Sequence, residues 1–295
     1  ATPVGARNCC AVSADSWANA AAEFGADCSR ELASELAAAA KVLERTREQW
    51  SKQAAALREG FVEWAALASW ADITQAQRML NANVGDSSKA VEMFLQALEL
   101  RARYRGLYDS LSCKVHSDMR IIGRDLEDHP VIYLCARSQT QPLRHCLEQF
   151  FLTFETACKI AAGRSEGRVY FVADMHGFSL DLNCESLAVR ELAKTLGTVY
   201  AERVFKIVIV DFSRAAQAVW WLAKPFMSSV TKKKFAFVSQ AKALEMCKQD
   251  FDSRTHDFVR HTCQVNRDPG ASPAERTLHA RRTAIHEVPL GPPLS

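Results

Sequence analysis

The sequence has no long apolar run. No apolar stretch approaches 18 residues, which is about the length that a membrane-spanning helix needs. The N-terminus has no basic segment followed by an apolar one, so a secretory leader is not indicated. We therefore expect a soluble, unsecreted protein of the cytoplasm.

Metal-site spacing and strong net charge are also missing. The ten cysteines form no C-x-x-C pair and no zinc spacing, and only Cys9 and Cys10 are neighbours. This favours scattered core thiols in a reducing compartment over a disulfide framework or a metal site. A net charge of +3 is too small to indicate nucleic acid. We predict no metal and no nucleic-acid partner.

The common enzyme motifs are absent too. Neither G-x-x-x-x-G-K-[ST] nor G-x-G-x-x-G occurs, so both phosphate-cradling loops are missing. Ser213 follows a strand pattern and opens a helix, but it lacks the flanking glycines of a nucleophile elbow. Asp174 and His176 share a loop after a strand end, where they could do acid–base work, but fixing of the loop by hydrogen bonds is the role that the sequence favours. Because no nucleophile or metal partner accompanies them, we predict no enzyme, no catalytic residue and no cofactor.

What the chain does contain is length and apolar content for a sizeable core: 295 residues, 48% of them hydrophobic. Four segments differ in pattern. We predict a weakly ordered segment at 1–30, a helical subdomain at 31–110, an α/β domain at 111–262 and a disordered, proline-bearing tail at 263–295.

The helical subdomain shows two blocks. From Leu32 apolar residues follow 4,3 spacing as far as Trp50, and Gly60 is a plausible break. The second block runs from Ile73 to Tyr108 and is interrupted at Asn83–Ser88 by turn and capping residues. Such a helix can pack on its own domain or serve as a coiled-coil arm, so a protein partner at these helices stays open.

Beyond residue 110 strands and helices alternate. The strand patterns are Val131–Cys135, Val169–Asp174, Val204–Val210 and Phe235–Val238, and the helical patterns between them are Leu143–Ala162, Glu185–Leu196 and Ser213–Pro225. β-α-β repetition of this kind predicts an α/β fold with a mostly parallel sheet and right-handed crossovers.

The last of these helices, Ser213–Pro225, has an unusual distribution of side chains around its axis. One face carries Phe212, Ala216, Val219, Trp220 and Ala223. Trp221 falls instead in the middle of the polar face. An indole there either packs on a neighbouring element or meets a membrane interface, and the sequence leaves both open.

Four motifs, in order, carry a family resemblance. They are VADMHGFSL at 172–180, YAER at 200–203, WWLAKPF at 220–226 and a basic turn before a strand at Lys232–Lys234. Over Ile73 to Val238 the chain resembles the CRAL-TRIO lipid-binding family, of the yeast phosphatidylinositol/phosphatidylcholine transfer protein type. The resemblance implies one hydrophobic ligand in a pocket beneath a gate helix, and lipid transfer as the function.

The resemblance also implies site residues. The pocket floor is expected at Val169, Phe171, Ala173, Ile207 and Ile209. The gate side chains are expected to be Phe212, Ala216, Val219, Trp220, Ala223 and Phe226. Glu202 and Lys234 match lipid-headgroup positions of the family, and Trp221 with Lys232, Lys233 and Lys234 is expected to contact a membrane transiently.

Departures from the family concern the headgroup. Phosphatidylinositol-binding members supply an Arg-Lys pair where this chain has Asn83 and Val84, and phosphatidylcholine binders place hydroxyl residues where it has Val169 and Phe171. A more apolar pocket disfavours phosphatidylinositol. Two alternatives remain: a non-transferring module that serves as a protein- or membrane-interaction scaffold, and a solid core with no pocket.

Overall fold

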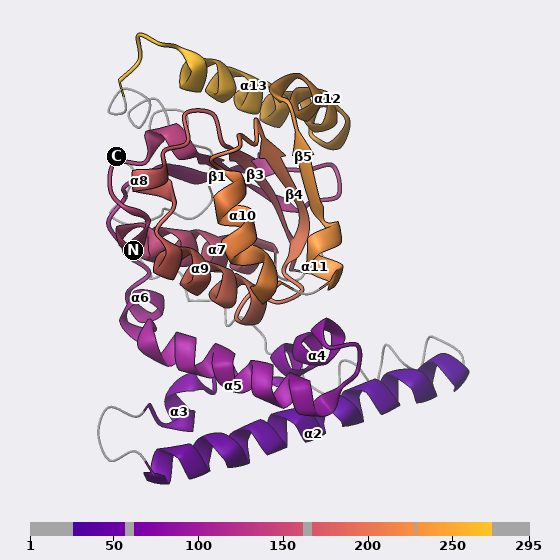
Figure 1. Cartoon of the computed structure of the whole chain (residues 1–295). Helices are drawn as coiled ribbons and strands as arrows, with labels where there is room; N and C mark the ends of the chain where they lie inside the picture. The colour runs from indigo at the N-terminus through magenta and orange to yellow at the C-terminus, as the bar shows by residue number, and fades with distance from the viewer. Residues whose placement is uncertain (1–25, 57–61, 162–166, 228, 273–295) are drawn as a thin grey trace, which may run out of the picture. The chain divides into compact units, whose positions relative to one another are not determined.

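The computed structural model describes residues 26–56, 62–161, 167–227 and 229–272 (Figure 1). These residues fall into two compact units, 1–91 and 92–295. The boundary lies inside helix α5, whereas the sequence predicted a change of architecture near residue 110. The predicted break at Gly60 and most of the predicted tail lie outside the described residues.

The N-terminal part is helical, as predicted. Its helices are α2 (Ala26–Ala56), α3 (Trp64–Leu67), α4 (Ile73–Ala82), α5 (Ser87–Arg103) and α6 (Arg105–Ser110). In the first unit α2 packs against α4, and Ala39, Thr46 and Trp50 of the predicted apolar stripe are buried. Asp72 caps α4 by accepting a 2.9 Å bond from the Gln75 amide.

The turn between α4 and α5 also follows the sequence. Val84 (φ 53°) and Gly85 (φ 82°) take left-handed backbone conformations. The Asp86 carboxylate accepts the backbone amides of Ser88 and Lys89, each at 3.1 Å. The predicted interruption at Asn83–Ser88 is therefore confirmed.

The second unit is built on a five-stranded sheet of order β1-β2-β3-β4-β5. The strands are β1 (Asp118–Arg124), β2 (Pro130–Cys135), β3 (Val169–Asp174), β4 (Val204–Val210) and β5 (Phe235–Val238). β2 to β5 are parallel, and β1 joins β2 antiparallel at the edge. The predicted mostly parallel α/β sheet is confirmed, and β1 is an addition that the sequence did not predict.

Helices cover both faces of this sheet (Figure 1). Between the strands lie η1 (Ala136–Ser138), η2 (Leu143–His145), α7 (Leu147–Ala161), α8 (Leu180–Asn183), α9 (Ser186–Thr198), α10 (Gln217–Ala223), η3 (Lys224–Phe226) and α11 (Ser229–Lys233). Each new parallel strand is added on the same side of the last one, so right-handed crossovers place α7, α9 and α10 on one common face.

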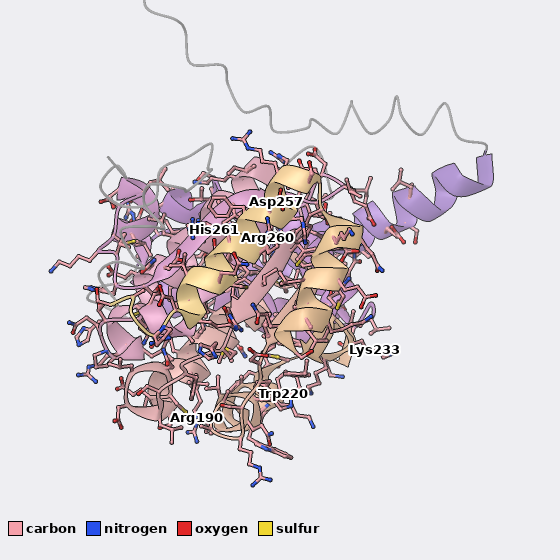
Figure 2. The ribbon with its side chains drawn as sticks, turned by 90° about the horizontal axis from the view of Figure 1, so that it is seen from above. Arg190, Trp220, Lys233, Asp257, Arg260 and His261 are labelled. Carbon is pink, nitrogen blue, oxygen red and sulfur yellow. The ribbon has the colours of Figure 1, made fainter. Side chains whose placement is uncertain are left out.

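The opposite face is covered by α12 (Gln240–Asp250) and α13 (Ser253–Arg267), which lie side by side (Figure 2). Apolar side chains of both helices pack on alternate residues of the strands; they include Cys247, Val259 and Cys263 against Tyr133, Tyr170, Val172 and Val208. This face is a solid core.

Helix α13 corrects the predicted tail. Cys263 is 1% exposed and the helix continues to Arg267, so ordered structure extends past residue 263, where the tail was expected to begin. The polar composition of this segment suggested disorder, yet Asp252 caps the helix through a 2.7 Å bond from the Thr255 amide.

Candidate functional site

The face under α9, α10 and α11 holds an apolar cavity. Strand register aligns Phe171 with Ile207, and Ile207 with Phe235, so their side chains form one continuous floor. The cavity measures about 120 Å³. Its walls are Phe154, Leu196, Gly197 and Tyr200, its floor adds Val204 and Ile209, and Met227 and Thr231 cover it.

The predicted pocket floor is brought together only in part. Phe171, Ile207 and Ile209 line the cavity. Val169 and Ala173 point to the same face of β3 and are buried, but they are not among the lining residues. The alternation of the strands gives the face correctly, and the helices above it decide how much of that face is open.

The two predicted headgroup residues meet at the cavity wall. Lys234 Nζ lies 3.6 Å from Glu202 Oε2 and donates a 2.6 Å bond to the carbonyl of Val204. Both side chains are about one-sixth exposed, at 17% and 16%. Burial lowers the pKa of Lys234, and the charge of Glu202 offsets only part of that effect. The ammonium is therefore already paired before any ligand arrives.

The YAER segment has a structural role on either side of Glu202. The Tyr200 hydroxyl donates a 2.9 Å bond to the carbonyl of Phe151, and Arg203 donates to the carbonyl of Gly167 at 3.2 Å. Glu202 itself has a left-handed backbone with φ 56°. These bonds fix the turn before β4 and hold the Glu202 carboxylate beside Lys234.

The predicted gate helix is shorter than expected. The α-helix begins only at Gln217, after Ala216 as its N-cap, so the predicted cap Ser213 lies outside it. The Ser213 hydroxyl instead accepts a 3.2 Å bond from the Ala216 amide in the turn that precedes the helix. Trp220 packs on Phe235 and Phe237, with ring centroids 4.8 and 5.1 Å apart.

The predicted gate side chains cover the sheet without lining the cavity. Phe212 packs on Phe237 at 4.6 Å, Ala216 and Ala223 are buried, and Val219 is half-buried. Phe226 is exposed. The lining residues on this side of the cavity are Met227, where the predicted gate segment Phe212–Met227 ends, and Thr231, which sequence reasoning missed.

The predicted membrane-contact residues divide between surface and interior. Trp221 is 67% exposed, and Lys224 lies 5.4 Å from its ring. Lys233 is exposed and Lys232 is half-buried at the end of α11, whereas Lys234 faces the cavity. Phe226 and Val230, close in sequence to these residues, are exposed as well.

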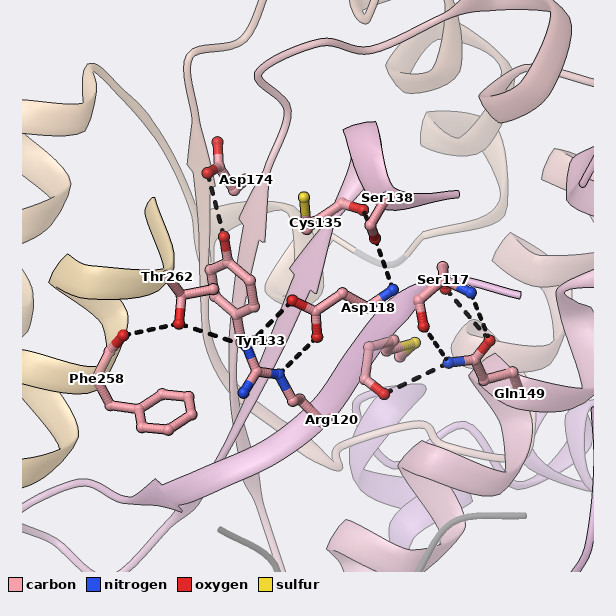
Figure 3. Close-up of polar contacts among 11 residues, drawn as sticks. Ser117, Asp118, Arg120, Tyr133, Cys135, Ser138, Gln149, Asp174, Phe258 and Thr262 are labelled. Atoms are coloured by element: carbon pink, nitrogen blue, oxygen red, sulfur yellow. Dashed lines mark hydrogen bonds and ion pairs between the residues drawn. The ribbon is translucent and has the colours of Figure 1, made fainter. Parts of the chain in front are cut away.

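Asp174 and His176 do not form an acid–base pair. Asp174 is fully buried and binds the Arg267 guanidinium at 2.7 and 3.0 Å. It also accepts bonds from Asn266 and from the Tyr133 hydroxyl, the latter drawn in Figure 3. Only the backbone amide of His176 reaches it, at 3.2 Å. This is the loop-fixing arrangement that the sequence favoured.

The residues that the structure describes show neither a membrane-spanning helix nor a metal-binding cluster. None of the helices that the structure describes is long and apolar enough to cross a membrane. Among the same residues, no group of three or more His, Cys, Asp or Glu side chains is arranged to hold a metal ion.

The chain is similar to known proteins both in a sequence profile and in fold. The sequence profile of the CRAL/TRIO domain matches residues 118–254, which start at β1 and end in the first turn of α13. The crystal structure of the yeast protein Sfh5 superposes with a TM-score of 0.53 at 13% sequence identity, covering 86% of this chain and 93% of that one. No curated protein matches the chain significantly in sequence.

Proposed function

Because residues 118–254 match the CRAL/TRIO domain, we propose that this chain holds one lipid in the apolar cavity and carries it between membranes. The domain implies a lipid or another small hydrophobic ligand. The observation that carries the proposal is a cavity with an almost wholly apolar lining and a single ion pair. Each methylene buried there contributes about 0.8 kcal/mol.

Transfer requires the cover to move. A cavity of about 120 Å³ is smaller than the roughly 300–1,000 Å³ of a pocket for a drug-sized ligand. A lipid chain therefore fits only when Met227 and Thr231 shift away from the strands. We assign the gate to the segment from α10 through η3 to α11, which would open on a membrane and close in solution.

Native mass spectrometry of protein purified from cells tests ligand binding. We expect about one lipid per chain in the wild type. Thr231→Trp places an indole in the cavity and should abolish the bound lipid. Val230→Trp adds the same ring at the neighbouring position, on the exposed side of α11, and this variant should retain the bound lipid. An empty wild type, or a Thr231→Trp variant with full lipid occupancy, would contradict the proposal.

Phosphatidylinositol is a poor ligand in this proposal. A desolvated phosphate needs several charge-assisted bonds, and Lys234 is already bound to Glu202 and to the carbonyl of Val204. We expect exchange of sterols or prenols between liposomes to exceed exchange of phosphatidylinositol. Robust phosphatidylinositol exchange would overturn this preference.

Lys234 also gives a prediction about lipid charge. Lys234→Ala should weaken binding of an anionic lipid roughly tenfold, because a charge-assisted bond is lost, and should leave a neutral lipid unaffected. Lys248→Ala removes the same charge from an exposed position on α12 and serves as the control. Titrations with both lipids decide, since an equal loss for the two lipids would indicate a folding defect instead.

Membrane docking is the third part of the proposal. Trp221 offers an interfacial ring, and each Lys near an anionic surface contributes about 1 kcal/mol. Co-sedimentation with anionic liposomes should be salt-sensitive, and should fall in Trp221→Ala and in a Lys232→Ala, Lys233→Ala double variant. A Lys242→Ala, Lys248→Ala pair on α12 is the charge-matched control. If the first two variants sedimented as the wild type does, the docking surface would not be at the gate.

A further inference from the structure

A second cleft lies at the carboxyl ends of the parallel strands, apart from the lipid cavity. Lys114 and His116 precede β1, and Asp118 of that strand pairs with Cys135, the last residue of β2. Helix α7 begins at the same edge after η2. The cleft between them measures about 470 Å³. Ligands of open α/β sheets bind outside this edge, whereas Glu202 and Lys234 stand at the opposite, amino-terminal edge.

The cleft gathers basic side chains. Lys114, His116, Arg144 and His145 line it, against one lining carboxylate, Glu148. In the described parts of the chain, no ion pair forms at the side chains of Lys114, His116 or His145. Burial lowers the pKa of His116, and the charges of His145 and Lys114 lower it further. These groups therefore face one another without a counter-ion of their own.

Hydrogen bonds hold the backbone of the cleft in place. Gln149 Oε1 accepts the amide of His116 at 2.9 Å. It also accepts the amide of Ser117 at 3.2 Å, and Gln149 Nε2 donates to the carbonyl of Ser117; the Ser117–Gln149 contacts are drawn in Figure 3. The Thr140 amide donates to the His116 carbonyl at 2.8 Å. Gln149 is 1% exposed, so the backbone at His116 is held from inside the fold. A backbone that is already ordered lowers the ordering cost of binding an anion at this position.

We propose that this cleft binds the phosphate group of a phosphorylated polyol. A phosphate monoester carries close to two negative charges and three acceptor oxygens, which match the donors of Lys114, His116 and His145. Arg144 already binds Glu185 at 3.1 Å and adds charge from the rim. The carboxylate of Glu148 and the amide of Gln141 accept hydroxyl groups, which suits a polyol. The phosphate can belong to a soluble ester or to a lipid headgroup.

Glycerol 3-phosphate is the probe for the soluble source. Calorimetric titration of the full chain should give binding at least tenfold tighter than for glycerate, which has the same carbon skeleton and only one charge. Imidazole resonances of His116 and His145 should shift on addition. The double variant Lys114→Gln, His116→Asn should lose at least tenfold in affinity, whereas Lys248→Gln on α12, across the sheet, should bind as the wild type does.

Vesicles separate the two sources of phosphate. Phosphatidic acid vesicles, compared with phosphatidylcholine vesicles, should shift the same histidine resonances if a lipid headgroup is the ligand. A response to glycerol 3-phosphate alone assigns the site to soluble esters, and a response to phosphatidic acid alone assigns it to the membrane; both support a phosphate site. No response to either, equal binding of glycerate, or undiminished binding by a folded double variant overturns the proposal.

Discussion

Replacing Arg267 with alanine is expected to lower the free energy of unfolding by about 3–5 kcal/mol. The guanidinium joins two strand ends, since it binds Asp174, the last residue of β3, and Asp211, which directly follows β4. Asp174 is 0% exposed, and removing its cationic partner leaves a buried carboxylate without charge compensation. Urea unfolding of the full-length wild type and variant measures the loss. The two free energies of unfolding are compared if both proteins show the same dependence of that free energy on urea concentration.

The same helix supplies the control. Arg260 pairs with Asp257 at 3.1 Å, but both side chains are about half exposed (Figure 2), so Arg260→Ala should cost no more than about 1 kcal/mol. Equal losses of unfolding free energy from Arg260→Ala and Arg267→Ala would show that the buried network stabilises the fold no more than an exposed ion pair does.

Acid should weaken the same network. Burial raises the pKa of Asp211, but the hydrogen bonds from Arg267 and the Gln240 amide outweigh it, so the pKa is lowered. A lowered pKa adds stability that is present above the unfolded value of about 3.9 and is lost as the pH falls through the folded value. Arg267→Ala should shrink this acid-dependent loss of stability.

The parallel strands were the part of the fold most open to prediction. β3, β4 and β5 begin and end where the sequence indicated, because short runs of β-branched and aromatic residues favour strands. β3 is buried on both faces, whereas β5 is only partly buried. Their alternation also separates Phe171 from Tyr170, and so the cavity face from the solid face. Local patterns carry this information, since it depends on residues two apart.

β1 and α13 could not be predicted from local pattern. β1 carries Asp118 and Arg120, which are buried and form a 2.5 Å ion pair drawn in Figure 3, so the strand does not read as apolar. The inward side of α13 includes Thr262 and Asn266, polar residues that look solvent-exposed in sequence. Their burial depends on partners more than 90 residues away, such as Asp174.

The sequence predicted which face of the sheet holds the cavity, but not all of the residues that enclose the cavity. The family resemblance pointed to Glu202 and Lys234, which lie next to each other, yet no sequence signal indicated that Thr231 lines the cavity. Met227 and Thr231 reach the cavity where η3 packs on α9. One close approach in that contact is between Gly197 and the backbone carbonyl of Phe226.

Gly197→Ala is expected to speed lipid release about tenfold. Gly197 lies on α9, and a Cβ atom there would come within 2.6 Å of the Phe226 carbonyl oxygen in η3. Backbone cannot yield as a flexible side chain does, so η3 must move away from α9 and carry the cover of the cavity with it. Overpacking of this kind costs about 1–3 kcal/mol, and 1.4 kcal/mol shifts the balance of closed and open states tenfold.

Fluorescent-lipid release from the full chain into acceptor liposomes measures this effect. Gly106→Ala is the matched control, because a Cβ at that position of α6 meets nothing within 4 Å and should leave release unchanged. Thermal unfolding of both variants establishes that they remain folded. If folded Gly197→Ala protein released lipid at the wild-type rate, η3 would not be the moving part, and the opening would have to be sought on the α11 side of the cavity.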